Sequence, residues 1–462
     1  MRVLGKRRSA ARIRRPRLRA IPAVEKILQS LGEIDTPRPL VVDVVRRELK
    51  TLRTGKSIPD AEDIIARVRS TLAVLRASRI QALINGTGIL VHTNLGRAPL
   101  GARAIAAIST AGAQYSNLEY SLSDGSRSGR AAYVERGLAV LCGAESATVV
   151  NNNAAALVLI LRHLCTATAN EVIISRGELV QIGGGFRIPE VLESSGARLR
   201  EVGTTNQTTA GDYARAITRQ TALILKVHRS NFFMDGFVES PPTEEIADLA
   251  RKKRVPLVED LGSGAMIETR TIPGLEHEPT PAETLRRGVD LVCFSGDKLF
   301  GGPQAGLVAG RQKLVAGLKR EPLFRALRCD KLILSGLQVT IDQYLRGERD
   351  VPVLEMLNVG CDELRVRAAS IVAALVGLPL VARVGEGRAQ LGGGTLPRSS
   401  IASVTVDLAH RSLKPQELAL RLRQQEPPMI GYLARGTLKL DLRTIFPRQD
   451  QDVIRALRAV CA

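Results

Sequence analysis

Residues 295–306 read SGDKLFGGPQAG and place a single lysine, Lys298, among small residues. They follow an apolar run over residues 289–294, which is typical of a buried parallel strand. Burial lowers the pKa of a lysine toward its neutral, nucleophilic form, and such an amine can form a Schiff base with an aldehyde. A solvated lysine in a turn is the alternative. Because short motifs often match by chance, the loop alone leaves both interpretations open.

The composition is that of a folded protein with two or three domains. The chain has 462 residues, of which 44% are hydrophobic, and this length allows a sizeable core. No apolar run approaches the roughly 20 residues that a transmembrane helix needs. The six cysteines are scattered and form no C-x-x-C pair, as in reduced cytosolic proteins. We therefore expect a cytoplasmic protein without a membrane partner.

The charge balance is strongly basic. The formal net charge is +20, which favours polyanionic partners such as nucleic acid. Residues 1–20 hold nine basic residues and no acidic one. This segment could bind RNA, form a solvated arm, mark an over-extended start or act as a transit peptide. We interpret it as a flexible basic tail.

The rest of the chain divides into four predicted segments. Residues 21–78 carry apolar residues at helical spacing and predict a small helical domain, whose last helix starts after Pro59-Asp60. Residues 79–100 form an irregular connector that contributes to the active site. Residues 101–345 predict a large domain, and residues 346–462 a small α+β domain.

The large domain alternates strand-like and helical patterns. The predicted strands are residues 147–150, 171–175, 198–202, 222–227, 256–260, 289–294 and 305–309. This alternation is typical of βα units and of a mainly parallel, seven-stranded sheet, in which ligands bind beyond the carboxyl ends of the strands. Further helices are expected at residues 243–253, 338–345, 361–375, 416–424 and 450–459, and strands of the small domain at residues 401–408, 429–433 and 437–442.

Two other strand ends carry residues that fit the chemistry of Lys298. One strand runs into Asn152, Asn153 and Ala154 and then a helix N-terminus, whose amides and dipole suit a phosphate; an ordinary capped helix is the alternative. Asp260 ends another strand, where a carboxylate can keep a pyridine nitrogen protonated; an Asx turn is the alternative.

The order of these residues predicts a cofactor. An aspartate, one strand and then a lysine is the order found in fold-type I pyridoxal phosphate enzymes. We expect pyridoxal 5'-phosphate to be bound by Lys298, Asp260, Asn152, Asn153, Ala154 and Ser295.

The motifs resemble those of one family, the bacterial selenocysteine synthases, which are L-seryl-tRNA(Sec) selenium transferases. The matching stretches are NGTG (85–88), HTNLGRA (92–98), NLEY (117–120), VNNNAAA (150–156), SRGELV (175–180), FRIP (186–189), EVGTTN (201–206), DLGSG (260–264) and the Lys298 loop. They follow one another along residues 21–462. Gln181 stands where the family usually has Glu, and Tyr432 where it has Arg; both departures concern the edge of the pocket.

The resemblance implies the fold of a fold-type I pyridoxal phosphate transferase and the following reaction. The cofactor held by Lys298 passes to the amino group of seryl-tRNA(Sec), and Lys298 then removes the α-proton. Loss of the β-hydroxyl leaves an aminoacrylyl-tRNA, to which selenium from selenophosphate adds. No metal is required.

The resemblance also implies partners. The helical domain binds the tRNA, and the enzyme that makes selenophosphate is a further candidate partner. Dimers with active sites between subunits are expected to assemble into a ring such as a decamer.

An anion site for selenophosphate follows from the same resemblance. The family places three arginines there, which correspond to Arg97, Arg325 and Arg328. If residues 322–328 are helical, Arg325 and Arg328 share one face.

Three other side chains are assigned to the same site. Asp297 is assigned a catalytic role in which it orients an arginine or Lys298. His92 and His228 either line the site or are hydrogen-bonded structural histidines.

Two other functions stay open at this point. One is a small-molecule pyridoxal phosphate lyase, similar to ammonia-lyases, that shares the core; the helical domain argues against it because small-molecule relatives tend to lack this domain. The other is a non-catalytic RNA-binding relative, against which the intact Lys298 and Asp260 argue.

Overall fold

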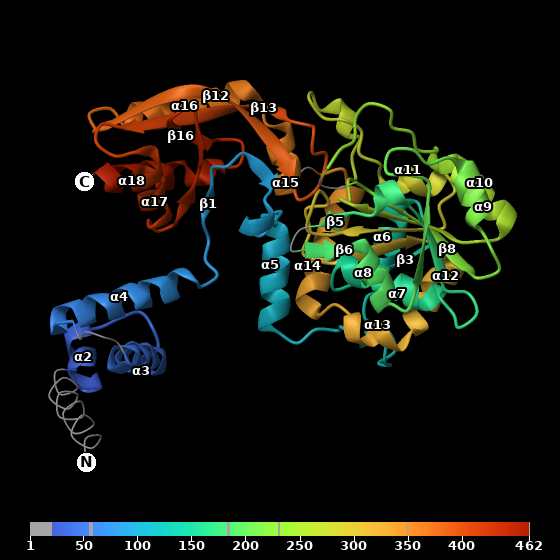
Figure 1. Ribbon diagram of the computed structural model, residues 1–462, viewed down its shortest axis with the longest axis horizontal. Helices are drawn as coiled ribbons and strands as arrows, with labels where there is room; N and C mark the ends of the chain where they lie inside the picture. Colours follow the sequence, from blue (N-terminus) through green and yellow to red (C-terminus); the bar gives the residue numbers. More distant parts are fainter. Residues whose placement is uncertain (1–20, 55–58, 183–184, 230–231, 349, 462) are drawn as a thin grey trace, which may run out of the picture. The chain divides into compact units, whose positions relative to one another are not determined.

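The computed structural model describes residues 21–54, 59–182, 185–229, 232–348 and 350–461 (Figure 1). The chain separates into two compact units, residues 1–82 and residues 83–462. The predicted basic tail, residues 1–20, lies outside the described residues. Within the described ranges, no helix has both the length and the apolar character that crossing a membrane requires.

The first unit is helical. It contains α2 (Val24–Leu31), α3 (Arg38–Thr54) and α4 (Ala61–Ala77), and the apolar faces of the three helices share one core. Asp60 caps α4, since its carboxylate accepts a hydrogen bond from the amide of Asp63 at 2.8 Å. The predicted start of this helix is therefore confirmed.

The second unit is built around a seven-stranded sheet. Its strand order is β3 (Ser146–Val150), β11 (Gly306–Gly310), β10 (Leu291–Ser295), β9 (Leu257–Gly262), β8 (Thr221–Val227), β4 (Glu171–Ser175) and β7 (Arg198–Val202). Only β11 runs antiparallel to its neighbours in this sheet. The predicted mainly parallel sheet of seven strands is confirmed.

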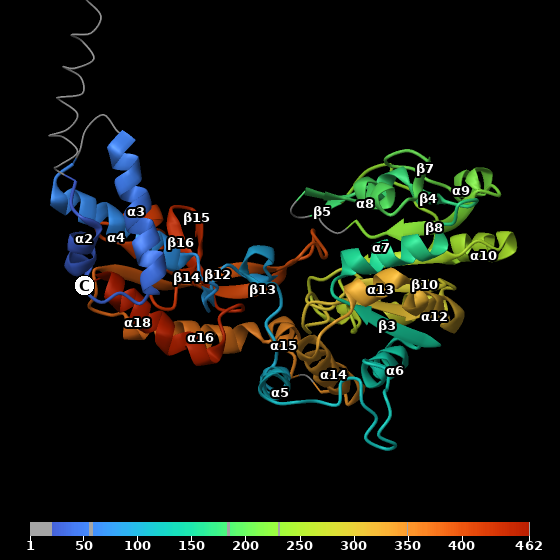
Figure 2. The same cartoon turned by 90° about the horizontal axis from the view of Figure 1, so that it is seen from below.

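Helices cover both faces of this sheet (Figure 2). Side chains alternate between the faces along each strand. In β8, for example, Ile224 packs on one side while Leu223 and Leu225 pack on the other. The first face is covered by α6 (Ala132–Cys142), α9 (Ala210–Ala216), α10 (Thr243–Lys253) and α14 (Lys331–Leu345), and the second by α7 (Asn153–Leu164), α8 (Ile188–Ser194) and α12 (Gln312–Arg320).

A second, five-stranded sheet forms the C-terminal part of this unit. Its order is β15 (Tyr432–Ala434), β16 (Thr437–Asp441), β13 (Ile401–His410), β12 (Leu380–Gly392) and β2 (Ile89–Val91). The helices α16 (Cys361–Ala374), α17 (Pro415–Arg423) and α18 (Asp450–Cys461) pack against it.

The connector takes part in this sheet and in a smaller one. β2 pairs with β12, and β1 (Ile84–Asn85) pairs with β14 (Met429–Ile430). The predicted strand over residues 429–433 is divided at Gly431. A Cβ there would lie 2.5 Å from the carbonyl oxygen of Lys439, so this close approach needs a glycine.

Further helices and strands complete the second unit. They are α5 (Ala102–Ala113), α11 (Pro281–Arg286), α13 (Pro322–Leu327), α15 (Pro352–Asn358), η1 (Thr93–Leu95), η2 (Arg176–Glu178), η4 (Thr269–Thr271), η5 (Pro447–Gln449), β5 (Gln181–Ile182) and β6 (Phe186–Arg187).

Candidate active site

Lys298 lies in the turn that follows β10, with only 7% of its surface exposed. Backbone hydrogen bonds fix this turn: the amide of Gly301 donates to the carbonyl of Lys298 at 3.0 Å, and that of Leu299 to the carbonyl of Ser263 at 2.9 Å. The loops after β9 and β10 are therefore joined at the lysine. Removal from water lowers the pKa of the Lys298 amine, and the charge of Asp260 opposes this effect.

Asp260 lies on β9, the strand next to β10, where it is in register with Cys293. Its Oδ1 accepts hydrogen bonds from Nδ2 of Asn153 at 2.8 Å and from the amide of Gly262 at 2.9 Å. Burial raises the pKa of this carboxyl, while Asn153 and the charge of Lys298 partly lower it. The predicted lysine and aspartate are thus both buried at the same edge of the sheet, and the charge of each affects the pKa of the other.

The N-terminus of α7 lies at the same edge of the sheet. Asn152 caps the helix, since its Oδ1 accepts a hydrogen bond from the amide of Ala155 at 2.8 Å. The first amides of a helix have no partner within the helix, so those of Asn153 and Ala154 can bind an anion. Gly306 of β11 packs against this turn; a Cβ there would lie 2.2 Å from the carbonyl oxygen of Asn152.

Buried polar atoms are left without a partner near Asp260 and Lys298. Among the described residues, none forms a hydrogen bond with Oδ1 of Asn153 or Oδ1 of Asp297. Unsatisfied buried groups are rare in native proteins, and an unseen ligand is one of their ordinary explanations.

His228 follows β8 and packs against the loop after β9. Its backbone amide donates to the carbonyl of Asp260 at 3.1 Å, and its Nε2 would lie 1.6 Å from a Cβ at Gly262. Burial and the charge of Lys298 lower the pKa of His228 to about 3, so the ring is neutral. His228 thus lies at the candidate site, whereas His92 caps η1 by accepting from the amide of Asn94 at 3.2 Å.

Asp297 pairs with an arginine of the connector. Its Oδ2 accepts from Nη1 of Arg97 at 2.7 Å and from Nε2 of Gln304 at 3.2 Å. All three residues line a cavity of about 510 Å³. Of the two orientations left open by the sequence, the structure favours the one in which Asp297 orients an arginine.

Arg325 and Arg328 do not share a helical face. α13 ends at Leu327, and Arg328 follows it in an extended conformation with ψ 143°. The Nη1 of Arg328 lies 3.8 Å from Oε1 of Glu119, and Arg328 lines a different cavity from the one that Arg97 lines. Within one chain, Arg97 and Arg328 are therefore not brought to one cavity.

Ser295 and Gln181 also have defined places. Ser295 is buried at the end of β10, opposite Gly306. Gln181 accepts a hydrogen bond from Nε of Arg187 at 2.9 Å, and Tyr432 lines a cavity in the five-stranded sheet.

Glu278 is a charged residue near Lys298 that the sequence did not reveal. It lies in an irregular loop between η4 and α11, where no periodic pattern or motif marks it. With His228 it lines a cavity of about 240 Å³, and the charge of Lys298 lowers its pKa against the larger opposing effect of burial.

Known proteins are similar to this chain in sequence. A family model described as "SelA: L-seryl-tRNA selenium transferase" matches residues 83–446. L-seryl-tRNA(Sec) selenium transferase from Geobacter sulfurreducens is 42% identical over 461 residues, covering 96% of this chain and 99% of the relative. The protein of the same name from Aquifex aeolicus is 42% identical over 447 residues, covering 96% and 98%.

A solved structure has the same fold. It is described as D-glucosaminate-6-phosphate ammonia-lyase and matches with a TM-score of 0.59, covering 84% of this chain and 98% of its own. At 21% identity the similarity concerns the fold alone.

Proposed function

Because the chain belongs to the L-seryl-tRNA(Sec) selenium transferase family, we propose that it converts seryl-tRNA(Sec) to selenocysteinyl-tRNA(Sec) with selenium from selenophosphate. The similarity over nearly the whole chain supports this substrate pair, and the buried Lys298 beside Asp260 carries the chemistry. The cytoplasm is the compartment we propose, since charged tRNA is used there.

The cofactor we propose is pyridoxal 5'-phosphate. Lys298 would hold its aldehyde carbon, Asp260 its ring nitrogen, and Asn152, Asn153, Ala154 and Ser295 would surround the phosphate and ring. The lowered pKa of Lys298 and the unpartnered Oδ1 of Asn153 within the described chain fit such a group. When bound, the cofactor supplies an electron sink that makes the α-proton of an attached amino acid acidic.

The side chains of the site have separate tasks in this proposal. Lys298, whose lowered pKa favours a neutral amine, accepts the α-proton of the seryl group. Asp297 holds the guanidinium of Arg97 toward the neighbouring cavity, where it binds oxygens of selenophosphate. His228 stays neutral and closes the site on the side of Gly262.

We propose that a second subunit completes the anion site. Arg325 and Arg328 are assigned to selenophosphate, but Arg328 lines another cavity than Arg97 in the single chain. Dimers assembled into a ring such as a decamer would bring such groups together.

We assign tRNA binding to the helical first unit, and the positive charge of the chain supports binding of a nucleic acid. The net charge of +20 supports a polyanionic substrate. Binding of seryl-tRNA(Sec) should therefore weaken steeply as the salt concentration rises.

Product analysis tests the proposal. The full-length protein with pyridoxal phosphate, seryl-tRNA(Sec) and selenophosphate should yield selenocysteinyl-tRNA(Sec), and the Lys298→Ala variant should not. Ammonia release from small amino acids, with no preference for tRNA(Sec) over bulk tRNA, would point to a lyase instead. A wild type that does not bind the cofactor would point to a non-catalytic RNA-binding protein.

A further inference from the structure

Glu278 shares a cavity with His228, the residue that packs against Gly262 at the end of β9. Glu278 lines the cavity of about 240 Å³ with His228, Arg229 and Arg398. Both the Glu278 carboxyl and the His228 ring respond to the charge of Lys298. Glu278 is only partly buried, so a ligand in this cavity can reach its carboxyl.

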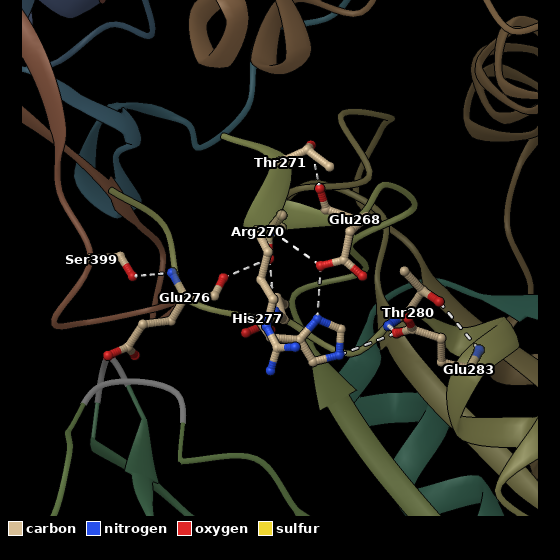
Figure 3. A network of polar contacts seen from close by, with 10 residues as sticks. Glu268, Arg270, Thr271, Glu276, His277, Thr280, Glu283 and Ser399 are labelled. Atoms are coloured by element: carbon tan, nitrogen blue, oxygen red, sulfur yellow. Dashed lines mark hydrogen bonds and ion pairs between the residues drawn. The ribbon is translucent and has the colours of Figure 1, made fainter. Parts of the chain in front are cut away.

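Polar contacts hold the backbone at Glu276 and at Glu278. The hydroxyl of Thr269 donates to the carbonyl of Glu276 at 2.7 Å and accepts from the amide of Glu278 at 2.8 Å. The amide of Glu276 donates to Oγ of Ser399 at 3.0 Å (Figure 3). The loop is thus tied both to η4 and to the segment between β12 and β13.

His277, the residue before Glu278, bridges two glutamates (Figure 3). Its Nδ1 lies 3.0 Å from Oε1 of Glu268, and its Nε2 lies 3.4 Å from Oε2 of Glu283. Glu283 is itself fixed, because it forms the capping box of α11 with Thr280. The backbone of Glu276 and Glu278 and the ring of His277 are therefore held in place, which fixes the course of the loop that carries Glu278.

The electrostatics of this cavity favour a protonated carboxyl. Burial raises the pKa of Glu278 to about 7, although the hydroxyl of Ser263 and the charges of Lys298 and His277 lower it in part. The charged or titratable groups that face it are Lys298 on the loop after β10, His277 on its own loop, and the cavity-lining His228, Arg229, Glu276 and Arg398.

The proposed reaction needs a proton donor at this place. When the seryl group loses water, its Cα–H bond breaks and the proton passes to the amine of Lys298. The electron pair of that bond forms the Cα=Cβ double bond as the Cβ–O bond breaks. The departing hydroxide must then receive a proton to leave as water.

We propose that Glu278 donates this proton to the departing β-hydroxyl and so becomes a carboxylate. The inference rests on the proposed function. It assigns to the site two separate groups, Lys298 as the acceptor of the α-proton and Glu278 as the donor to the leaving group. Active sites commonly pair a proton acceptor with a proton donor by holding the pKa values of the two groups apart.

The first experiment separates the two proton transfers. Glu278→Gln keeps the size of the side chain but has no acidic proton. In D₂O, the holoenzyme variant should exchange the α-proton of seryl-tRNA(Sec) within a few fold of wild type, while elimination falls about 100-fold or more. Glu259→Gln is the matched control, since burial raises the pKa of that carboxyl also to about 7; it should leave both steps unchanged.

The second experiment changes the leaving group. The Glu278→Gln variant should eliminate chloride from β-chloroalanyl-tRNA(Sec) at nearly the wild-type rate, because chloride leaves without a proton. Equal losses with both substrates would mean that Glu278 only maintains the structure and would overturn the proposal. Undiminished elimination of water by the variant would overturn it too.

Two further readouts do not depend on turnover. Wild type and Glu278→Gln should bind equal amounts of cofactor, measured by its absorbance. Glu278 and Glu259 should both contribute to the infrared carbonyl band of protonated carboxyls that disappears as the pH rises through about 7, and Glu278→Gln should lose the share of this band that Glu278 contributes. A band unchanged by the substitution would contradict the proposal. If wild type itself neither exchanges nor eliminates, the proposed function fails and the assignment of Glu278 fails with it.

Discussion

Nη1 of Arg97 lies 2.7 Å from Oδ2 of Asp297, the residue directly before Lys298. Arg97 makes this contact from a left-handed backbone conformation with φ 65°. Such angles are uncommon for residues other than glycine and cluster at functional sites. The ion pair ties the connector, with its arginine-containing motif, to the turn that carries the lysine.

Asp297→Asn should weaken the use of selenophosphate. The amide can still accept a hydrogen bond from Arg97 but carries no negative charge to pair with the guanidinium, which costs about 1.4 kcal/mol, or about tenfold in the KM for selenophosphate. Steady-state kinetics measures this change. The double variant Arg97→Ala with Asp297→Asn should be no worse than Arg97→Ala alone, since the two act as one unit. Losses that add in full would contradict the shared role.

Gly262→Ala should displace His228 and reduce cofactor binding. The added Cβ would lie 1.6 Å from Nε2 of His228, on a backbone with φ 62°. Gly143→Ala is the matched control, because Gly143 has φ 60° but no neighbour within 4 Å of an added Cβ. It should cost only about 1 kcal/mol of backbone strain. Titration with pyridoxal phosphate and thermal unfolding compare the two. Equal behaviour would show that the His228 contact is unimportant.

Asp260→Asn should slow proton removal from the substrate without unfolding the protein. An amide can still pair with Asn153, but it carries no charge to stabilise a protonated ring nitrogen. We expect α-proton exchange to fall about 100-fold or more, by analogy with the loss of a single electrostatic contact in other active sites. The rate of α-proton exchange is measured in D₂O. A rate equal to that of wild type would contradict the proposed role of Asp260 at the ring nitrogen.

Glu259 predicts a dependence of stability on pH. Burial raises the pKa of this carboxyl from 4.5 to about 7. Because the folded protein favours the protonated carboxyl, the stabilising contribution of Glu259 to the free energy of unfolding is fully present below pH 4.5. This contribution is lost as the pH rises through about 7, which lowers the free energy of unfolding by at most about 3 kcal/mol. Glu259→Gln should therefore unfold at a higher temperature than wild type above pH 7, with little difference near pH 4.5. The exposed Glu363→Gln serves as control and should show no such pH-dependent gain; an equal gain there would contradict the role of Glu259.

The strands of the large sheet could be predicted because burial on both faces leaves a simple pattern. The segment Glu171–Ser175, which is buried at every residue, agrees with the structure residue by residue. β12 was not predicted, although it has 13 residues, because two internal glycines and the charged Arg383, Glu386 and Arg388 interrupt any apolar alternation.

The site was predictable where residues follow strands and not where they lie in irregular loops. Lys298 and Asp260 each follow an apolar run, so a single rule places both at one edge of the sheet. Arg328 was expected on a helical face, but α13 stops one residue earlier. Glu278 lies in a loop whose course depends on side-chain contacts of Thr269, His277 and Ser399, and such contacts leave no periodic pattern in the sequence.

In the proposed function, Lys298 is the amine that holds the cofactor. Reduction of the pyridoxal phosphate-loaded protein with borohydride, followed by protease digestion and mass spectrometry, locates that amine. We predict a phosphopyridoxyl group on the peptide that contains Lys298 and its disappearance in Lys298→Ala. Labelling of another lysine, or none at all in a protein saturated with the cofactor, would contradict the account.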